Sequence, residues 1–237
     1  GACSDTMEYN GKYMMQNNFE YTKNLMHFAV DRKIQMIYAS SASTYGSGTN
    51  GFREEPACEE ALNVYAFSKL FFDNYARRYF GKTNSQLVGL RYFNVYGPQE
   101  NHKGKMASMV FQMYNQWLAE KKVKLFDAYG DYGAGEQTRD FIYVKDVANA
   151  NYLVGIENVE NEIFNVSNNG KISINDLFLA MKKAFGYKKS AIHREKRVGD
   201  IRDSRLSNAL LKSKTSFEAK YSIQEGLEEY ARSLGCI

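Results

Sequence analysis

Tyr65 and Lys69 have the types and the spacing of an acid–base pair. They stand four positions apart in a run with helical periodicity, and this spacing places two side chains on one face of a helix. A tyrosine exchanges a proton with a reacting alcohol only when its pKa is lowered, which the charge of a lysine one turn away would do. A surface Tyr-Lys pair without function has the same spacing, so this interpretation needs a second motif.

A serine-rich run supplies the second motif. Residues 40–46, Ser-Ser-Ala-Ser-Thr-Tyr-Gly, directly follow the apolar run 34–39. A serine hydroxyl at the end of a strand can hydrogen-bond a substrate oxygen and share a proton with a phenol. An ordinary turn rich in Ser and Gly is the structural alternative. The two motifs together are far less expected by chance than either one by itself.

The elements around these motifs alternate between helix and strand. Residues 17–30 and 65–78 have the periodicity of helices, whereas 34–39 and 85–92 are short runs typical of strands. This alternation predicts βαβ units, and therefore a parallel sheet with helices on both faces. Ligands of such folds bind beyond the carboxyl ends of the strands, where the polar stretches after the two strands lie.

From residue 103 onward the expected elements become short and mixed. This texture predicts a smaller lobe built beside the sheet. The expected helices are 106–120, 146–156 and one beginning at Ser173, the expected strands are 122–128, 139–144 and 161–166, and 129–137 is a Gly-rich loop.

The composition excludes several classes of protein. The 237 residues are 44% hydrophobic and 24% charged, which is ordinary for a globular protein and unlike a disordered chain or a fibre. No apolar run approaches the length of a membrane-spanning helix, and no signal-peptide pattern stands at the start. The 31 basic and 27 acidic residues are interspersed, so no basic patch indicates nucleic-acid binding.

The cysteines indicate neither a disulfide framework nor a metal site. Cys3, Cys58 and Cys236 are odd in number and widely spaced, without a CxxC pattern or a Cys/His cluster. They are typical of reduced thiols in a cytosolic protein. We therefore expect a cytoplasmic location and no bound metal.

Four segments resemble the extended short-chain dehydrogenase/reductase family. They are the run 40–46, the pair Tyr65 and Lys69, Arg91-Tyr-Phe-Asn-Val-Tyr-Gly-Pro98, and Arg139-Asp-Phe-Ile-Tyr-Val-Lys-Asp146. Further segments are similar to the branch of 6-epimerases that act on ADP-linked heptoses: Gly1-Ala-Cys-Ser4, residues 11–18, and Gly97-Pro-Gln-Glu-Asn-His-Lys-Gly104 followed by Met106-Ala-Ser108.

The resemblance implies a doubly wound, Rossmann-like α/β fold with a smaller mixed α/β substrate lobe. Residues 1–98 would be the remainder of the NADP-binding domain, and residues 99–237 mainly the substrate lobe, with 139–166 returning to the nucleotide domain. The Gly-rich turn that seats a pyrophosphate occurs nowhere in the sequence, and Gly1 resembles a point inside the nucleotide domain. We therefore expect the first strands of the fold to be absent from this sequence, and these 237 residues by themselves to retain no cofactor.

The activity that the resemblance implies is epimerisation at C6 of ADP-D-glycero-D-manno-heptose for a lipopolysaccharide core. The reaction would pass through a transient ketone, with hydride transfer to and from tightly bound NADP; NAD stays possible because the deciding residues would lie upstream of Gly1. Inversion needs a base on each side, and by position these are Tyr65 and Lys103. Lys69 would hold the nicotinamide ribose, and Ser41 the reacting oxygen.

The resemblance also implies residues that contact the cofactor and the substrate. The cofactor contacts are Gly1, Ala2, Cys3, Ser4, Asn17, Tyr65, Lys69 and Val95. The substrate contacts are Ser41, Asn94, Lys105, Gln112, Arg139 and Arg202. An arginine suits a diphosphate because its guanidinium makes paired, charge-assisted hydrogen bonds. For Arg139 the alternative is a structural ion pair with Asp140 or another carboxylate.

Some positions depart from the heptose-epimerase pattern. Lys105 stands where those enzymes have Ser, and Gln112 where they have His. The loop 127–137 is longer and resembles the GxGxQxRDF pattern of other nucleotide-sugar enzymes. These departures leave the reaction class unchanged but bear on the identity of the sugar.

Two other functions remain as alternatives. A 4-epimerase or 4,6-dehydratase of a UDP- or GDP-sugar would use the same Tyr-Lys pair, but a dehydratase usually has an acidic residue beside its serine, and residues 41–44 have none. A non-catalytic nucleotide-sugar binding protein would tolerate loss of Tyr65 or Lys69, and both are present. The resemblance further implies a homo-oligomer, a pentamer in the heptose epimerases.

Overall fold

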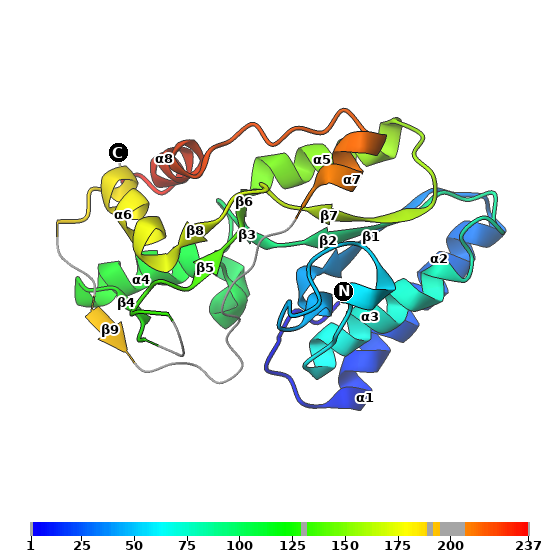
Figure 1. The fold of residues 1–237 in the computed structure, drawn as a ribbon, viewed down its shortest axis with the longest axis horizontal. Coiled ribbons are helices and arrows are strands. Elements are labelled where there is room, and N and C mark those ends of the chain that lie inside the picture. The colour runs from blue at the N-terminus through cyan, green and yellow to red at the C-terminus, as the bar shows by residue number, and fades with distance from the viewer. Residues whose placement is uncertain (1, 129–131, 189–191, 195–206, 237) are drawn as a thin grey trace. The chain divides into compact units, whose positions relative to one another are not determined.

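The computed structural model describes residues 2–128, 132–188, 192–194 and 207–236. The chain forms two compact units (Figure 1). Unit 1 consists of Gly1–Phe93, Ala148–Val166 and Ser207–Glu218. Unit 2 consists of Asn94–Val147, Ser167–Leu206 and Ala219–Ile237. Each unit is therefore assembled from separate stretches of the sequence.

A parallel sheet forms the centre of unit 1. Its strands are β1 (Met36–Ser41), β2 (Leu87–Tyr92) and β7 (Glu162–Val166), in the order β1-β2-β7. Both pairs are parallel, and Ser41 stands opposite Tyr92 in the register. The carboxyl ends of β1 and β2 thus lie side by side, as the predicted βαβ units require. The expected α/β class is confirmed.

Helices cover both faces of this sheet (Figure 1). On one side lie α2 (Tyr21–Asp31) and α3 (Val64–Arg77), with α1 (Gly11–Met14) and a π-helical turn at Met15–Glu20 before them. On the other side lie α5 (Val144–Ile156) and α7 (Ala209–Lys214). Two short 3-10 helices, Ala42–Tyr45 and Pro56–Cys58, occupy the connection between β1 and α3.

Local sequence explains where α3 begins and which face it buries. The side chain of Asn63 accepts a hydrogen bond from the backbone N–H of Ala66 and caps the helix. Phe72 then packs against Tyr38 of β1, with their ring centroids 4.7 Å apart, in a core that also includes Met26 of α2. Packing of the apolar face of α3 against β1 therefore fixes the distance between β1 and the polar residues of α3.

Within its described residues, unit 2 contains three pairs of short strands. The parallel pairs are β3 (Asn94–Tyr96) with β6 (Phe141–Tyr143) and β4 (Lys124–Phe126) with β9 (Ile192–Arg194), and the antiparallel pair is β5 (Thr138–Arg139) with β8 (Ile172–Ser173). The single strand expected over 139–144 is instead two strands, because its halves pair with different partners. The strand expected over 122–128 is shorter, and α5 begins two residues before the expected start.

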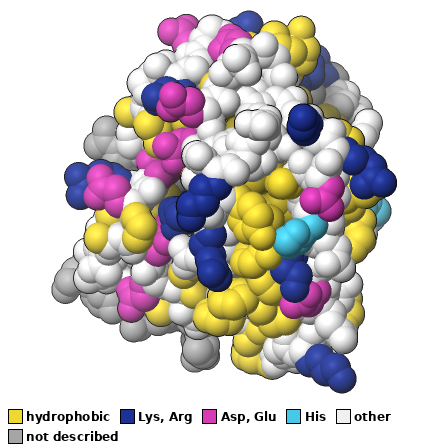
Figure 2. All heavy atoms as spheres, turned by 90° about the vertical axis from the view of Figure 1, so that its right-hand side faces the viewer, with side chains coloured by type: hydrophobic (Ala, Val, Ile, Leu, Met, Phe, Trp, Pro, Cys, Tyr) yellow, Lys and Arg dark blue, Asp and Glu magenta, His cyan; other side chains and the backbone are white. Residues whose placement is uncertain are grey.

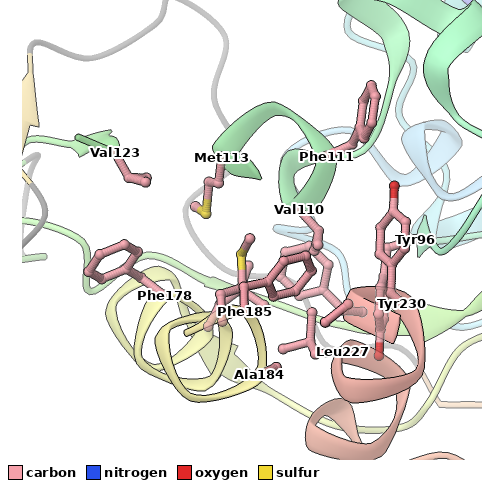
Figure 3. Packing of buried hydrophobic residues seen from close by; sticks show 14 of the residues in the cluster. Tyr96, Val110, Phe111, Met113, Val123, Phe178, Ala184, Phe185, Leu227 and Tyr230 are labelled. Atoms are coloured by element: carbon pink, nitrogen blue, oxygen red, sulfur yellow. The ribbon is translucent and has the colours of Figure 1, made fainter. Parts of the chain in front are cut away.

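In the described part of unit 2, three helices pack around its core (Figure 3). They are α4 (Met109–Glu120), α6 (Ile174–Phe185) and α8 (Ile223–Ser233), and a 3-10 segment at Asn101–Met106 precedes α4. Val110 of α4, Phe185 of α6 and Leu227 of α8 all belong to one buried cluster. This packing anchors α4, the helix that follows the segment carrying Lys103.

Several large hydrophobic side chains are exposed on α2 and α3. Figure 2 views the side on which α1, α2 and α3 lie in Figure 1 and shows hydrophobic side chains gathered there. Large exposed hydrophobic residues on these two helices are Tyr21, Leu25, Phe28, Phe67 and Phe71. In the described part of the chain, none of the helices has the length and apolarity needed to cross a membrane.

Candidate active site

Tyr65 and Lys69 lie one turn apart at the start of α3. The Lys69 ammonium is 6.0 Å from the centroid of the Tyr65 ring. Lys69 is buried, and its Nζ donates a hydrogen bond of 2.8 Å to the carbonyl of Ala39, near the end of β1. An ammonium has three N–H donors, so this bond aims Lys69 at the strand end while other donors can reach a ligand hydroxyl.

The pKa of Lys69 reflects two opposing effects. Burial lowers it below its usual value, because the charged ammonium loses solvation, whereas the negative charge of Asp73 raises it. The net shift is downward. Lys69 therefore loses its charge at a lower pH than an exposed lysine.

Ser41 ends β1 beside Tyr65. It accepts hydrogen bonds from the backbone N–H of Ser43 at 3.2 Å and from the Ser43 hydroxyl at 2.9 Å. Burial raises the pKa of Tyr65, and a hydrogen bond with Ser41 lowers it by less. The net shift of the Tyr65 pKa is upward, because desolvation of the phenolate outweighs the hydrogen bond with Ser41.

The N-terminal segment is held at this site by Asn18. The Asn18 amide accepts from the backbone N–H of Cys3 at 2.7 Å and donates to the Cys3 carbonyl at 3.0 Å and to the Ser68 hydroxyl at 2.9 Å. The expected cofactor residue Asn17 instead donates to the carbonyl of Tyr13 in α1, four residues earlier. Sequence reasoning missed Asn18 because two asparagines are adjacent, and only the tertiary packing buries Asn18.

The other expected cofactor residues are less informative. Ala2 and Ser4 are exposed on either side of the clamped Cys3, and Val95 is half-buried in β3 of unit 2. Gly1 lies outside the described residues.

A buried carboxylate shapes the segment that carries Lys103. Glu100 accepts from the hydroxyl of Ser108 at 2.7 Å and from its backbone N–H at 2.6 Å. Lys103 itself is exposed, with its Nζ 3.9 Å from Glu100 Oε2, and Lys105 is exposed as well. Gln112 donates to the carbonyl of Gly104 at 2.9 Å. The glutamine expected on the substrate side thus braces the backbone between the two lysines.

Two expected substrate residues flank Asp140 in unit 2. The side-chain amide of Asn94 donates to the Asp140 carbonyl at 2.8 Å. Arg139 is buried, and its guanidinium donates to the carbonyl of Thr138 at 2.8 Å. In the extended loop, Gln137 donates to the carbonyl of Asp127 at 2.9 Å and joins the two ends. Arg202 lies outside the described residues.

A buried network of charges lies beneath the site in unit 1. Arg91 of β2 is fully buried and pairs with Asp73 at 2.7 Å and with Glu59 at 2.6 Å. Arg77 contacts the same Glu59 oxygen at 2.5 Å. Burial opposes the ionisation of Glu59, but the two arginines hold its pKa below the usual value. Sequence reasoning missed this network because its members are far apart along the chain.

The structure groups the candidate residues by unit. Ser41, Tyr65 and Lys69 come together in unit 1, and the segment with Lys103 belongs to unit 2. A hydroxyl, a phenol and an ammonium at one strand end suit the binding and deprotonation of an alcohol. Within the described ranges, no cluster of three or more His, Cys, Asp or Glu side chains could hold a metal ion.

Sequence comparison places these residues among epimerases. A model described as the NAD dependent epimerase/dehydratase family matches residues 1–167. A protein of Brachyspira hyodysenteriae named ADP-L-glycero-D-manno-heptose-6-epimerase is 50% identical over 187 residues, which cover 78% of this chain and 57% of that protein. A protein of the same name from Thiobacillus denitrificans is 48% identical over 184 residues, 78% of this chain and 55% of that protein. The chain thus spans little more than half the length of these relatives.

Solved structures share the fold. The ADP-L-glycero-D-manno-heptose-6-epimerase of Helicobacter pylori matches with a TM-score of 0.87 and 32% identity, over 100% of this chain and 71% of that chain. The UDP-N-acetylglucosamine 4-epimerase of Methanobrevibacter ruminantium, in complex with UDP-N-acetylmuramic acid, matches with a TM-score of 0.84 and 27% identity, over 95% and 71% of the two chains. The UDP-glucose 4-epimerase of Thermus thermophilus, in complex with NAD, matches with a TM-score of 0.81 and 25% identity, over 99% and 75%.

Proposed function

Because this chain belongs to the NAD dependent epimerase/dehydratase family, we propose that its protein converts ADP-D-glycero-D-manno-heptose to ADP-L-glycero-D-manno-heptose by inversion at C6. The observation that carries this proposal is the 50% identity to a relative named for that reaction. The arrangement of Ser41, Tyr65 and Lys69 supports it, since oxidation at C6 begins with removal of a proton from a hydroxyl.

The residues of unit 1 fit a nicotinamide cofactor. The ammonium of Lys69 faces the end of β1, where it could donate to the hydroxyls of a ribose, and Asn18 fixes the backbone of Cys3 nearby. Bound there, the cofactor would supply reversible hydride acceptance. We assign NADP rather than NAD on the resemblance to heptose epimerases, and we assign unit 1 to the cofactor and unit 2 to the substrate.

The chain's own residues would handle the proton. Ser41 would hold the oxygen on C6 by a hydrogen bond, and Tyr65 would remove its proton on one face and return it in the reverse step. Inversion needs a second acid–base group, and we assign it to Lys103, whose side chain is exposed to incoming substrate. Asn94, Lys105, Gln112, Arg139 and Arg202 would contact the rest of the nucleotide sugar.

The wider role follows from the same proposal. The product would serve the synthesis of a lipopolysaccharide core in the cytoplasm. We propose a homo-oligomer, on the resemblance to pentameric heptose epimerases, and the exposed apolar side chains of α2 and α3 (Figure 2) are suited to contact another surface. Sedimentation analysis of the full-length protein would measure its subunit number.

Product analysis tests the reaction directly. The full-length protein is incubated with ADP-D-glycero-D-manno-heptose, and the configuration at C6 is followed by NMR. We expect inversion at C6 without net consumption of cofactor. The absence of turnover with this substrate, together with turnover of UDP-hexoses, would replace the proposal.

A second candidate is a 4-epimerase acting on a UDP-sugar. The resemblance of the sequence of loop 127–137 to the GxGxQxRDF pattern of other nucleotide-sugar enzymes supports it, as does the likeness to the 4-epimerase of Methanobrevibacter ruminantium. Incubation with UDP-glucose and UDP-N-acetylglucosamine separates the two candidates. Inversion at C4 of either sugar would favour the 4-epimerase.

A further inference from the structure

One face of α3 holds two adjacent residues at the end of β1. Lys69 donates to the carbonyl of Ala39 at 2.8 Å, and the hydroxyl of Ser40 donates to Asp73 Oδ2 at 2.9 Å. Lys69 and Asp73 are one helical turn apart, so they extend from the same side of the helix. These two bonds connect the strand to the helix immediately before Ser41.

The Asp73 carboxylate is a firmly held acceptor. Neither Asp73 nor Arg91 exposes any of its side chain, and Arg91 donates to the same Oδ2 through Nε at 3.0 Å and Nη2 at 2.7 Å. Arg91 is also the register partner of Ser40 in the sheet. A buried carboxylate persists only when it is paired and hydrogen-bonded, so the arginine holds in place the oxygen that Ser40 binds.

The contacts of the Ser41 side chain hold it less firmly than the contacts of Asp73 hold that carboxylate. Its hydroxyl accepts from Ser43, a neighbour in the same turn, and such local bonds move together with the strand end. Tyr65, by contrast, is carried by α3, the helix that also carries Asp73. The distance from Ser41 to Tyr65 therefore depends on how β1 is attached to α3.

We propose that Ser40 and Asp73 are positioning residues that hold Ser41 in hydrogen-bonding reach of Tyr65. The proposal rests on the proposed function for the reacting roles of Ser41 and Tyr65, whereas the positioning itself is a property of the protein without substrate. A displacement of about 1 Å at a reacting group can cost about a hundredfold in rate. Loss of one tether, with the strand still in place, is expected to cost about tenfold.

Ser40→Ala tests the proposal against Ser85→Ala as a matched control. Ser85 is a buried serine of unit 1, 3% exposed against 4% for Ser40, and its hydroxyl donates to the carbonyl of Ala29 at 3.2 Å. It precedes β2, away from the carboxyl ends of the strands. In the full-length protein we expect Ser40→Ala to lower kcat about tenfold with KM changed less than about twofold, and Ser85→Ala to keep the wild-type kcat at a similar loss of Tm.

A double-mutant cycle separates positioning from general stability. If Ser40 acts through Ser41, the loss of kcat caused by Ser40→Ala disappears in a Ser41→Ala background, because the positioned hydroxyl is already gone. If Ser40→Ala lowers kcat by the same factor in both backgrounds, the proposal is overturned. Equal losses of kcat in Ser40→Ala and Ser85→Ala would overturn it as well.

A measurement without substrate makes the test independent of the proposed function. The protein is labelled with [13Cζ]tyrosine, and the Tyr65 signal is assigned with Tyr65→Phe. We expect its chemical shift at neutral pH to move in Ser40→Ala, which weakens the hydrogen bond with Ser41, and to stay unchanged in Ser85→Ala. An unchanged signal in Ser40→Ala rejects the positioning role, whereas a wild-type protein inactive on every nucleotide sugar rejects only the proposed function.

Discussion

Tyr65 and Lys103 are proposed for the same chemical task, yet the two units hold them in different ways. Tyr65 lies in the first turn of a 14-residue helix, half-buried beside Ser41. Lys103 lies in a short 3-10 segment, its side chain is 44% exposed, and the carboxylate of Glu100 is 3.9 Å away. A regular helix positions Tyr65, whereas the 3-10 segment positions the backbone of Lys103 but not its side chain.

The difference in burial indicates what determines the acid–base behaviour of each group. Burial raises the pKa of Tyr65, so its acid–base behaviour depends on its protein neighbours. The Lys103 side chain is 44% exposed, and ordering it on a substrate would cost conformational entropy. If both residues act as proposed, Tyr65 would be a pre-arranged group, and Lys103 a group that substrate must order.

Replacement of Tyr65 should have the largest effect. Tyr65→Phe removes the phenol hydroxyl and should lower kcat by at least about a hundredfold, the usual scale of a lost acid–base group. Tyr75→Phe is the matched control, because Tyr75 lies on the same helix with its hydroxyl 2.7 Å from His27, and it should retain full activity. Wild-type activity in Tyr65→Phe would remove this residue from the mechanism.

Lys103→Met should lower the rate on the same scale but leave stability unchanged. The ammonium is exposed and makes one long contact with Glu100, and such surface pairs contribute about 0–1 kcal/mol. Tm should therefore stay within error of the wild type while kcat falls by at least about a hundredfold. Lys122→Met, at another exposed lysine of unit 2, is the control. A fully active Lys103→Met protein would remove Lys103 from the mechanism and leave Tyr65 as the acid–base group of the proposal.

The charge of Lys69 should govern cofactor affinity and its pH dependence. Lys69→Ala should weaken cofactor binding by about tenfold or more, since a hydrogen bond to a charged group is worth about 1.5–3 kcal/mol. Burial lowers the pKa of Lys69 from its usual 10.5, so the ammonium exists below that reduced pKa and is lost above it. Affinity should therefore fall as pH rises through a value lower than that of an exposed lysine.

Lys69→Arg provides the control for this titration, because a guanidinium stays charged over the whole range. Its cofactor affinity, measured by fluorescence, should not decline in the same pH window. A wild-type affinity that is constant up to the pKa of an ordinary lysine would mean that burial does not affect the binding form of Lys69.

Of the substitutions at the four proposed site residues, Arg139→Ala should have the smallest effect on activity. If the guanidinium makes charge-assisted hydrogen bonds with a diphosphate, KM should rise several-fold and by more than kcat falls. Steady-state kinetics with the nucleotide sugar measure both constants. An unchanged KM together with a lowered Tm would assign Arg139, which is buried and bonded to Thr138, to structure.

Short-range features of the site were predictable from the sequence. The face shared by Tyr65 and Lys69 and the serine-rich run that follows an apolar strand both depend on residues within a few positions of one another, although the strand itself, Met36–Ser41, begins and ends two residues later than the expected 34–39. Helical and strand periodicity are local properties, and so a single sequence contains them. The parallel sheet followed from their alternation and is confirmed.

Long-range features were decided by the tertiary structure. The hydrogen bonds of Ser40 with Asp73 and of Arg91 with Glu59 join residues about thirty positions apart. Nothing in the local sequence distinguishes these buried side chains from solvated ones. The same holds for Asn18 and Gln112, whose amides meet backbone groups that only folding brings near. Sequence determined which chemical groups the site contains. Packing decided which of them are buried, and burial decides which pKa values shift and which hydrogen bonds can hold a reacting group in place.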